Sequence, residues 1–195
     1  MKIYFPPSRY YEFGQPVEIT PLTILVGESG TGKTAFASCV PKYRGPRAAR
    51  DSNRRAYERV LAREFDVRTD SLTVLEIVLV PMIPPGSRGY AYIVHPACET
   101  HPRTQAAVGS FLARMVREGR RILVETLCDY LIDRILIEAA RDLKLAKKVS
   151  LLYFAKKQPI CSIKVDRNGN LVDPPKGYRK WFLEEEEARM LGVSD

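Results

Sequence analysis

The sequence has few of the residues that build disulfide frameworks or zinc sites, and it has no long apolar run. Its four cysteines in 195 residues are widely spaced and form no Cys-x-x-Cys pair. A zinc site is therefore not indicated, and free thiols are expected. No apolar stretch approaches the roughly 18 residues that a membrane-spanning helix needs. The first residues also lack the apolar segment of a secretory signal peptide, so we expect a cytoplasmic protein without a membrane span.

Asparagine and glutamine are also scarce, whereas arginine, lysine and glutamate are plentiful. This composition favours a heat-adapted source, a thermophile, in which a cytoplasmic disulfide would be less surprising. The net charge of +8 permits contact with nucleic acid without demonstrating it. Much of the excess lies between Lys42 and Arg63, and the part from Arg47 to Arg59 has two interpretations. It is either the solvated face of a helix or a patch on a non-enzymatic regulatory subunit that binds nucleic acid or a protein partner.

One stretch fits the phosphate-binding pattern G-x-x-x-x-G-K-[ST] at every specified position. It follows an apolar run and consists of Gly27, Glu28, Ser29, Gly30, Thr31, Gly32, Lys33 and Thr34. Glycines let a backbone wrap around an anion, and the short helix expected next would point its positive end at the phosphates. Lys33 would reach the β- and γ-phosphates, and the Thr34 hydroxyl would hold Mg²⁺. The sequence therefore predicts a binding site for a nucleoside triphosphate.

Strands and helices alternate along the chain. Strands are predicted at residues 2–5, 16–19, 22–26, 89–94 and 121–125. Amphipathic helices are predicted at residues 47–64, 102–119 and 129–143, and an apolar segment at 71–80 favours a buried helix. This alternation after a phosphate-binding loop indicates an α/β fold of the P-loop type, with a parallel sheet flanked by helices. We expect the first two strands to form a small antiparallel edge.

The sequence changes character near residue 148. Two strands are predicted at residues 149–155 and 160–165, and the turn dipeptide Asn168-Gly169 would return the chain as a β-hairpin. An acidic tail with four consecutive glutamates follows, starting at Glu184. We therefore divide the chain into a compact ATPase-like domain, residues 1–147, and a C-terminal hairpin extension with its tail, residues 148–195, packed on the same domain.

Several stretches resemble a known group of proteins. They are residues 21–34, 84–105, 119–131 and 149–178. In these stretches the chain is similar to ABC/SMC-like P-loop ATPases, specifically to the AAA-type, OLD-related predicted ATPases that end in a small C-terminal domain of unknown function. The resemblance implies an ABC-ATPase-like fold that binds ATP with Mg²⁺. It also implies that two such domains meet across two nucleotides, as a homodimer or with a partner ATPase subunit.

The chain departs from this family where the family places its catalytic groups. Val94 stands where an acid organises the metal, Ala97 where an acid polarises the attacking water, and Leu127 where a histidine contacts the γ-phosphate. In the signature segment that a partner subunit presents to the nucleotide, only Ser71 is retained, without its glycine neighbours. Phosphoryl transfer depends on positioned charge and an oriented water, so the sequence predicts that hydrolysis is weak or absent.

Two glutamates are candidates to replace the missing acids. Glu125 ends one predicted core strand, close to where a phosphate-sensing residue sits in the family, and Glu99 lies a few residues after another strand. With either residue as the substitute acid the chain would be an active ATPase. His95 and His101 are further candidate bases, although a structural role is the default expectation for each.

Overall fold

The computed structural model describes residues 1–9, 14–42, 80–98 and 100–179, together with Glu184, Glu187 and Met190. Several sequence-based predictions fall outside these residues. They are the helix at 47–64, most of the apolar segment at 71–80, the basic block between Arg47 and Arg59, Ser71, and the candidate acid Glu99.

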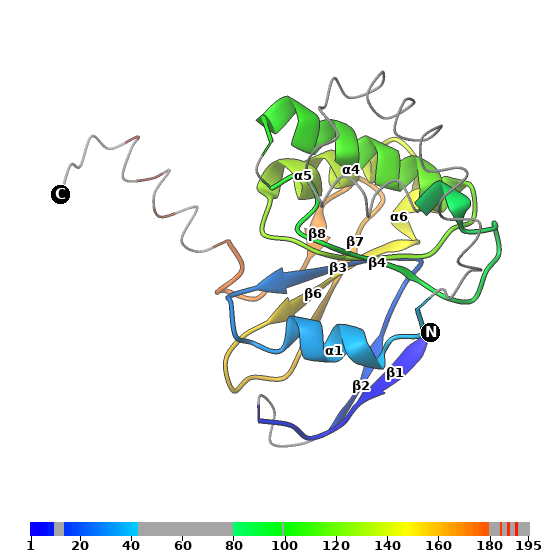
Figure 1. The fold of residues 1–195 in the computed structure, drawn as a ribbon. Coiled ribbons are helices and arrows are strands. Elements are labelled where there is room, and N and C mark those ends of the chain that lie inside the picture. Colours follow the sequence, from blue (N-terminus) through cyan, green and yellow to red (C-terminus); the bar gives the residue numbers. More distant parts are fainter. Residues whose placement is uncertain are drawn as a thin grey trace.

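A six-stranded sheet in the order β4-β5-β3-β6-β7-β8 runs through the centre of the molecule (Figure 1). Its strands are β3 (Leu22–Gly27), β4 (Ala91–Val94), β5 (Ile122–Glu125), β6 (Val149–Phe154), β7 (Cys161–Val165) and β8 (Leu171–Val172). The first four in spatial order pair in parallel, and the last two pairings are antiparallel. β5 is buried at every position, because the central strands of such a sheet are covered on both faces. The predicted α/β class with a mostly parallel sheet is confirmed.

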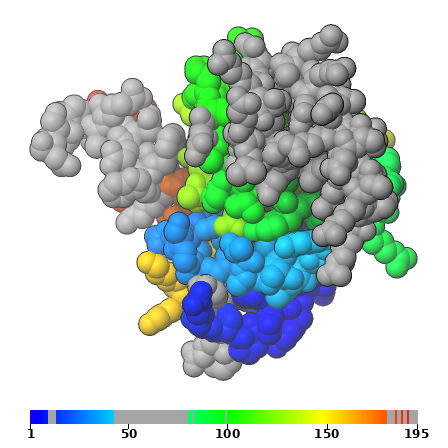
Figure 2. Space-filling view, in the orientation of Figure 1, coloured from blue at the N-terminus to red at the C-terminus, as the bar shows by residue number. Residues whose placement is uncertain are grey.

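Other elements cover the two faces of this sheet (Figure 1). On one face lie α4 (Pro102–Arg117), α5 (Asp129–Ala140) and α6 (Leu143–Ala146), and on the other lie α1 (Lys33–Cys39), β1 (Lys2–Phe5) and β2 (Gln15–Glu18). Each face has its own apolar core, one around Leu112 and Ile135 and the other around Phe36 and Phe154. Figure 2 shows the pale blue and cyan segment that contains α1 between the green α4 side and the blue strands β1 and β2.

The first two strands form a separate sheet, and not an edge of the main sheet. β1 and β2 pair antiparallel, with Ile3 opposite Val17. Alternate residues of β1 are buried, and Phe5 packs edge-to-face on Phe36 of α1 with ring centroids 5.5 Å apart. The place beside β6 in the main sheet is taken by β7 instead. The period-2 pattern therefore belongs to a ribbon that packs against α1.

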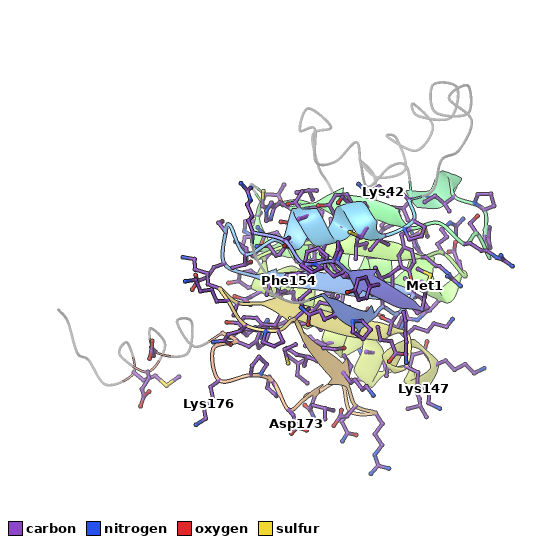
Figure 3. The ribbon with its side chains drawn as sticks, turned by 90° about the horizontal axis from the view of Figure 1, so that it is seen from below. Met1, Lys42, Lys147, Phe154, Asp173 and Lys176 are labelled. Atoms are coloured by element: carbon purple, nitrogen blue, oxygen red, sulfur yellow. The ribbon has the colours of Figure 1, made fainter. Side chains whose placement is uncertain are left out.

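The C-terminal strands continue the main sheet, and the predicted hairpin is confirmed. β7 pairs antiparallel with β6 and then with β8. In the turn between β7 and β8, Gly169 has a φ of 80°, and the Asp166 carboxylate accepts hydrogen bonds from two backbone amides. Viewed from below, Asp173 after β8 and Lys42 after α1 lie at opposite margins of the molecule (Figure 3).

The helix predicted at residues 129–143 ends earlier, and a second short helix follows it. α5 ends at Ala140, and the Asp142 carboxylate accepts hydrogen bonds from the amides of Lys144 and Leu145 at 2.9 and 3.3 Å. An aspartate in this role caps a new helix, α6, and so separates it from the preceding one. A single turn of 3-10 helix, η1 (Val80–Met82), precedes β4. Among the described helices, none has the length and apolarity needed to cross a lipid bilayer.

We expect Ile135→Ala to lower the free energy of unfolding by about 2–5 kcal/mol, because Ile135 is fully buried in the core beneath α5. Ile137 lies two residues further along the same helix with 43% of its surface exposed, so Ile137→Ala is the matched control. Its effect should stay within about 0.5 kcal/mol. Urea denaturation of both variants measures the difference, and equal losses would contradict the assignment of the two faces of α5.

Candidate functional site

The loop between β3 and α1 follows a path that glycine adopts more readily than other residues. Gly27, Gly30 and Gly32 have φ angles of 129°, 75° and 94°. Gly27 also lies against β6, where a Cβ atom would come within 2.1 Å of the Phe154 carbonyl oxygen. A Cβ atom on Gly30 would meet nothing within 4 Å. Gly27 is therefore required by its backbone angle and by packing, and Gly30 by its angle alone.

The Lys33 side chain folds back onto this loop. Its Nζ donates hydrogen bonds to the carbonyl oxygens of Gly27 at 2.6 Å and Glu28 at 2.8 Å, and the residue is only 5% exposed. The Thr31 hydroxyl donates to the same Glu28 carbonyl at 2.7 Å. Burial lowers the pKa of Lys33, and the negative charges of Glu125 and Glu28 oppose that shift. The loop thus holds a buried ammonium whose hydrogen-bond partners are neutral carbonyls.

Glu125 brings a carboxylate to the start of α1. β5 pairs in parallel with β3 and sets Glu125 opposite Leu25, two residues before the glycine loop begins. The Thr34 hydroxyl donates to this carboxylate, with Oγ1 lying 3.2 Å from Oε2 and 3.4 Å from Oε1. Glu125 is 5% exposed, and none of the ion pairs within the described ranges involves it. It is a buried carboxylate whose hydrogen-bond partners are neutral.

A tyrosine of the neighbouring strand holds the same carboxylate. The Tyr92 hydroxyl donates to Oε2 of Glu125 at 2.7 Å. In the pairing of β4 with β5, Val94 lies opposite Glu125. Tyr92 is two residues before Val94, so its side chain is on the same face of the sheet and reaches the carboxylate diagonally. The Nζ atom of Lys42 lies 4.6 Å from the centroid of the Tyr92 ring. Sequence patterns did not identify Tyr92, because its partner depends on the register between strands.

The three positions at which the resemblance in sequence implies missing catalytic groups, Val94, Ala97 and Leu127, lie at or just after the ends of β4 and β5. Val94 is the register partner of Glu125. Ala97 is buried in a turn with a φ of 61°, and Leu127 is 55% exposed. None of these side chains can take part in acid–base chemistry. The carboxylate next to the loop comes from the strand beside Val94 instead.

Among the described contacts, neither histidine side chain hydrogen-bonds to the loop or to the Glu125 carboxylate. His101 caps α4, where its Nδ1 accepts a hydrogen bond from the Arg103 amide at 3.2 Å, so the structure assigns it a structural role. The backbone amide of His95 donates to the Glu125 carbonyl at 2.7 Å, and its side chain lines a cavity of about 520 Å³ together with Leu127. Across the described ranges, no cluster of three or more His, Cys, Asp or Glu side chains is arranged to hold a metal ion.

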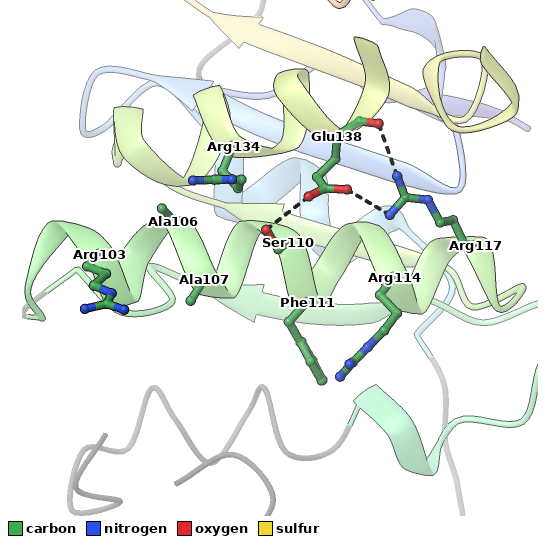
Figure 4. A pocket seen from close by; sticks show the side chains of 9 residues that line it. All are labelled: Arg103, Ala106, Ala107, Ser110, Phe111, Arg114, Arg117, Arg134 and Glu138. Atoms are coloured by element: carbon green, nitrogen blue, oxygen red, sulfur yellow. Dashed lines mark hydrogen bonds and ion pairs between the residues drawn. The ribbon is translucent and has the colours of Figure 1, made fainter. Parts of the chain in front are cut away.

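A second cavity, of about 600 Å³, lies along α4 and α5 (Figure 4). Its lining residues are Arg103, Ala106, Ala107, Ser110, Phe111, Arg114, Arg117, Arg134 and Glu138. Arg117 and Ser110 of α4 both contact Glu138 of α5, at 3.0 and 3.2 Å. Because α4 and α5 cover the face of the sheet opposite α1, this basic cavity is separate from the glycine loop.

Comparisons with known proteins do not assign this site. The chain matches no protein-family model, no curated protein and no solved structure. The residues of the loop and of the strand ends beside it are therefore the features that indicate a function.

We expect Gly27→Ala to destabilise the fold more than Gly30→Ala. Both substitutions place a side chain at positive φ, which costs about 1–2 kcal/mol. At Gly27 the new Cβ also overlaps the Phe154 carbonyl, which adds roughly 1–3 kcal/mol for overpacking. Thermal denaturation of the two variants checks this expectation. Equal midpoints would show that the loop can move away from β6.

Proposed function

We propose that this chain is an ABC-ATPase-like P-loop domain that binds ATP with Mg²⁺ at the loop from Gly27 to Thr34, and that hydrolysis there is weak or absent. One observation carries the proposal: the buried Glu125 carboxylate accepts a hydrogen bond from the Thr34 hydroxyl beside that loop. Ligands of open parallel sheets bind beyond the carboxyl ends of the strands, and β3 and β5 both end here. The fold by itself supports only the α/β class.

The surroundings of the Glu125 carboxylate favour a bound cation. Burying a carboxylate is costly unless a cation or strong donors compensate it. Glu125 accepts hydrogen bonds from two hydroxyl groups and interacts at longer range with the charge of Lys33, but it forms no ion pair among the described residues. Mg²⁺ prefers oxygen ligands and is commonly held by one or two carboxylates together with substrate phosphates. A hydroxyl that donates its proton to a carboxylate keeps its lone pairs for a cation. Thr34 and Glu125 therefore fit Mg²⁺, which when bound would neutralise charge on the phosphates.

The loop also carries groups that favour bound phosphates. Lys33 is a buried ammonium whose current partners are the carbonyl oxygens of Gly27 and Glu28. Phosphate oxygens carry formal charge, and charge-assisted hydrogen bonds are roughly twice as strong as neutral ones. Consecutive backbone amides in turns with positive φ form concave sites for anions. These features together support binding of a polyphosphate.

The expectation of weak hydrolysis follows from the partners of Glu125. Its carboxylate already accepts hydrogen bonds from Thr34 and Tyr92, an arrangement suited to orienting a metal ligand and not to removing a proton from water. Val94 and Ala97 supply no second acid at the end of β4. Loss of a general base typically costs 10²- to 10⁴-fold in rate. Pairing of two domains across nucleotides, which the resemblance implies, stays a prediction.

An active ATPase is the second candidate function, and the position of Glu125 is the observation that favours it. A carboxylate within hydrogen-bond distance of Thr34 lies close to where Mg²⁺ and the terminal phosphate would bind. If bound nucleotide shifted the Thr34 contact, Glu125 would be free to orient water. Only a measurement of turnover separates this candidate from nucleotide binding without hydrolysis.

We expect Lys33→Ala to weaken ATP binding by about 10- to 100-fold, the loss expected when hydrogen bonds to a charged group are removed. Isothermal titration with ATP and Mg²⁺ measures the affinity. Lys164→Ala removes an exposed lysine on β7 and is the matched control, which should bind as the unmodified protein does. Unchanged affinity in Lys33→Ala would exclude the loop as the binding site.

We expect Glu125→Gln to weaken ATP binding in the presence of Mg²⁺ more than in the presence of EDTA, because the substitution removes the charge while keeping the shape. Phosphate release over hours is measured on the same preparations. Turnover near background in the unmodified protein supports binding without hydrolysis. Turnover well above background that disappears in both Lys33→Ala and Glu125→Gln would establish the ATPase instead.

A further inference from the structure

We infer that Tyr92 is a positioning residue for the metal site: its hydroxyl fixes the orientation of the Glu125 carboxylate, and Lys42 supports its ring. This inference rests on the proposed binding of ATP with Mg²⁺ at the loop. Val94, the register partner of Glu125 on β4, has no polar side chain, so Tyr92 is the residue of β4 that holds the Glu125 carboxylate in place.

Two hydroxyl groups reach the Glu125 carboxylate from different elements. Thr34 approaches from α1, and Tyr92 approaches from β4 with the shorter contact, 2.7 Å to Oε2. A glutamate side chain has several rotatable bonds, so a single hydrogen bond would leave the carboxylate free to turn about that contact. Donors from two separate elements determine both its position and its rotation. The orientation of a carboxylate matters at a metal site, because hydrogen bonds from neighbouring side chains to a metal ligand set the geometry of that ligand.

Tyr92 is itself held in place. Its backbone lies in β4 with Leu123 as its register partner, which puts the ring on the α1 face of the sheet. The ammonium of Lys42 lies 4.6 Å from the ring centroid, a distance typical of a cation–π contact. Lys42 is in turn held next to the start of β4. It forms a parallel bridge with Tyr90, the residue before β4, and the Tyr90 amide donates to the Pro41 carbonyl at 2.9 Å.

These contacts connect both ends of α1 to one carboxylate. Thr34 lies in the first turn of α1, and Lys42 follows the last turn, which ends at Cys39. Figure 3 shows Lys42 beside α1 at the margin of the molecule. The start of this seven-residue helix contacts Glu125 directly through Thr34. The residue Lys42 beyond its end contacts Tyr92, which in turn donates to Glu125. Loss of the Tyr92 hydroxyl would remove its hydrogen bond to Glu125 and keep the aromatic ring that Lys42 contacts.

The test compares Tyr92→Phe with Tyr90→Phe. Both substitutions remove a phenolic hydroxyl from neighbouring positions, but the Tyr90 hydroxyl donates to the Thr20 carbonyl and not to Glu125. ATP affinity is titrated at graded Mg²⁺ concentrations and in EDTA. We expect the Mg²⁺ concentration for half-maximal enhancement of ATP binding to rise about tenfold in Tyr92→Phe, with ATP affinity in EDTA unchanged. Tyr90→Phe should match the unmodified protein in both measurements.

Lys42→Gln is a second variant, which tests the inference if Tyr92→Phe does not fold. Lys42 is exposed, so its substitution should leave the fold intact. It should raise the same Mg²⁺ concentration two- to fivefold, as expected for loss of a cation–π contact. An unchanged Mg²⁺ dependence in the variant that folds, or an equal change in Tyr90→Phe, overturns the inference. Absence of Mg²⁺-dependent ATP binding in the unmodified protein instead refutes the proposed function, and the inference with it.

Discussion

The parallel register between β3 and β5 determines where the charged groups of this molecule meet. It sets Leu25 opposite Glu125, so the carboxylate lies at the sheet edge where the glycine loop begins. Side chains alternate between the two faces of a strand, and a shift of one residue would turn Glu125 toward α4 and α5. In the register observed, it faces α1 and meets Thr34. The apolar residues that fill both faces of the sheet hold this register in place.

Strand pairing also decides which side chains surround Glu125. Neighbouring strands lie about 4.8 Å apart, so side chains at the ends of β4 and β5 lie within reach of one another. Val94 is the register partner of Glu125 and offers no polar group. Tyr92, two residues earlier on β4, supplies the hydroxyl that donates to the carboxylate. The ends of these two strands therefore present one carboxylate, held by a hydroxyl of the neighbouring strand.

Local patterns were sufficient to predict those parts of the fold that depend on neighbouring residues. The apolar strand before the glycine loop, the helix opened by Pro102 and the turn at Asn168-Gly169 were all predictable, because periodicity and turn chemistry act over a few residues. The ribbon of β1 and β2 on α1 was not, since alternation does not say what a strand packs against. Both Thr34 and Glu125 were candidate residues, but they are 91 positions apart in sequence. Their contact, like that of Tyr92, follows only from strand pairing.

The folded-back Lys33 side chain affects how an anion could bind at the loop. The carbonyl oxygens of Gly27 and Glu28 accept hydrogen bonds from two of the three N–H groups of its ammonium. These bonds hold Nζ against the loop and leave one N–H for an incoming group. A free lysine side chain loses rotamer entropy when it is ordered, at a cost of up to about 2 kcal/mol. Under the proposed function, folding of the loop has already met this entropic cost before an anion binds.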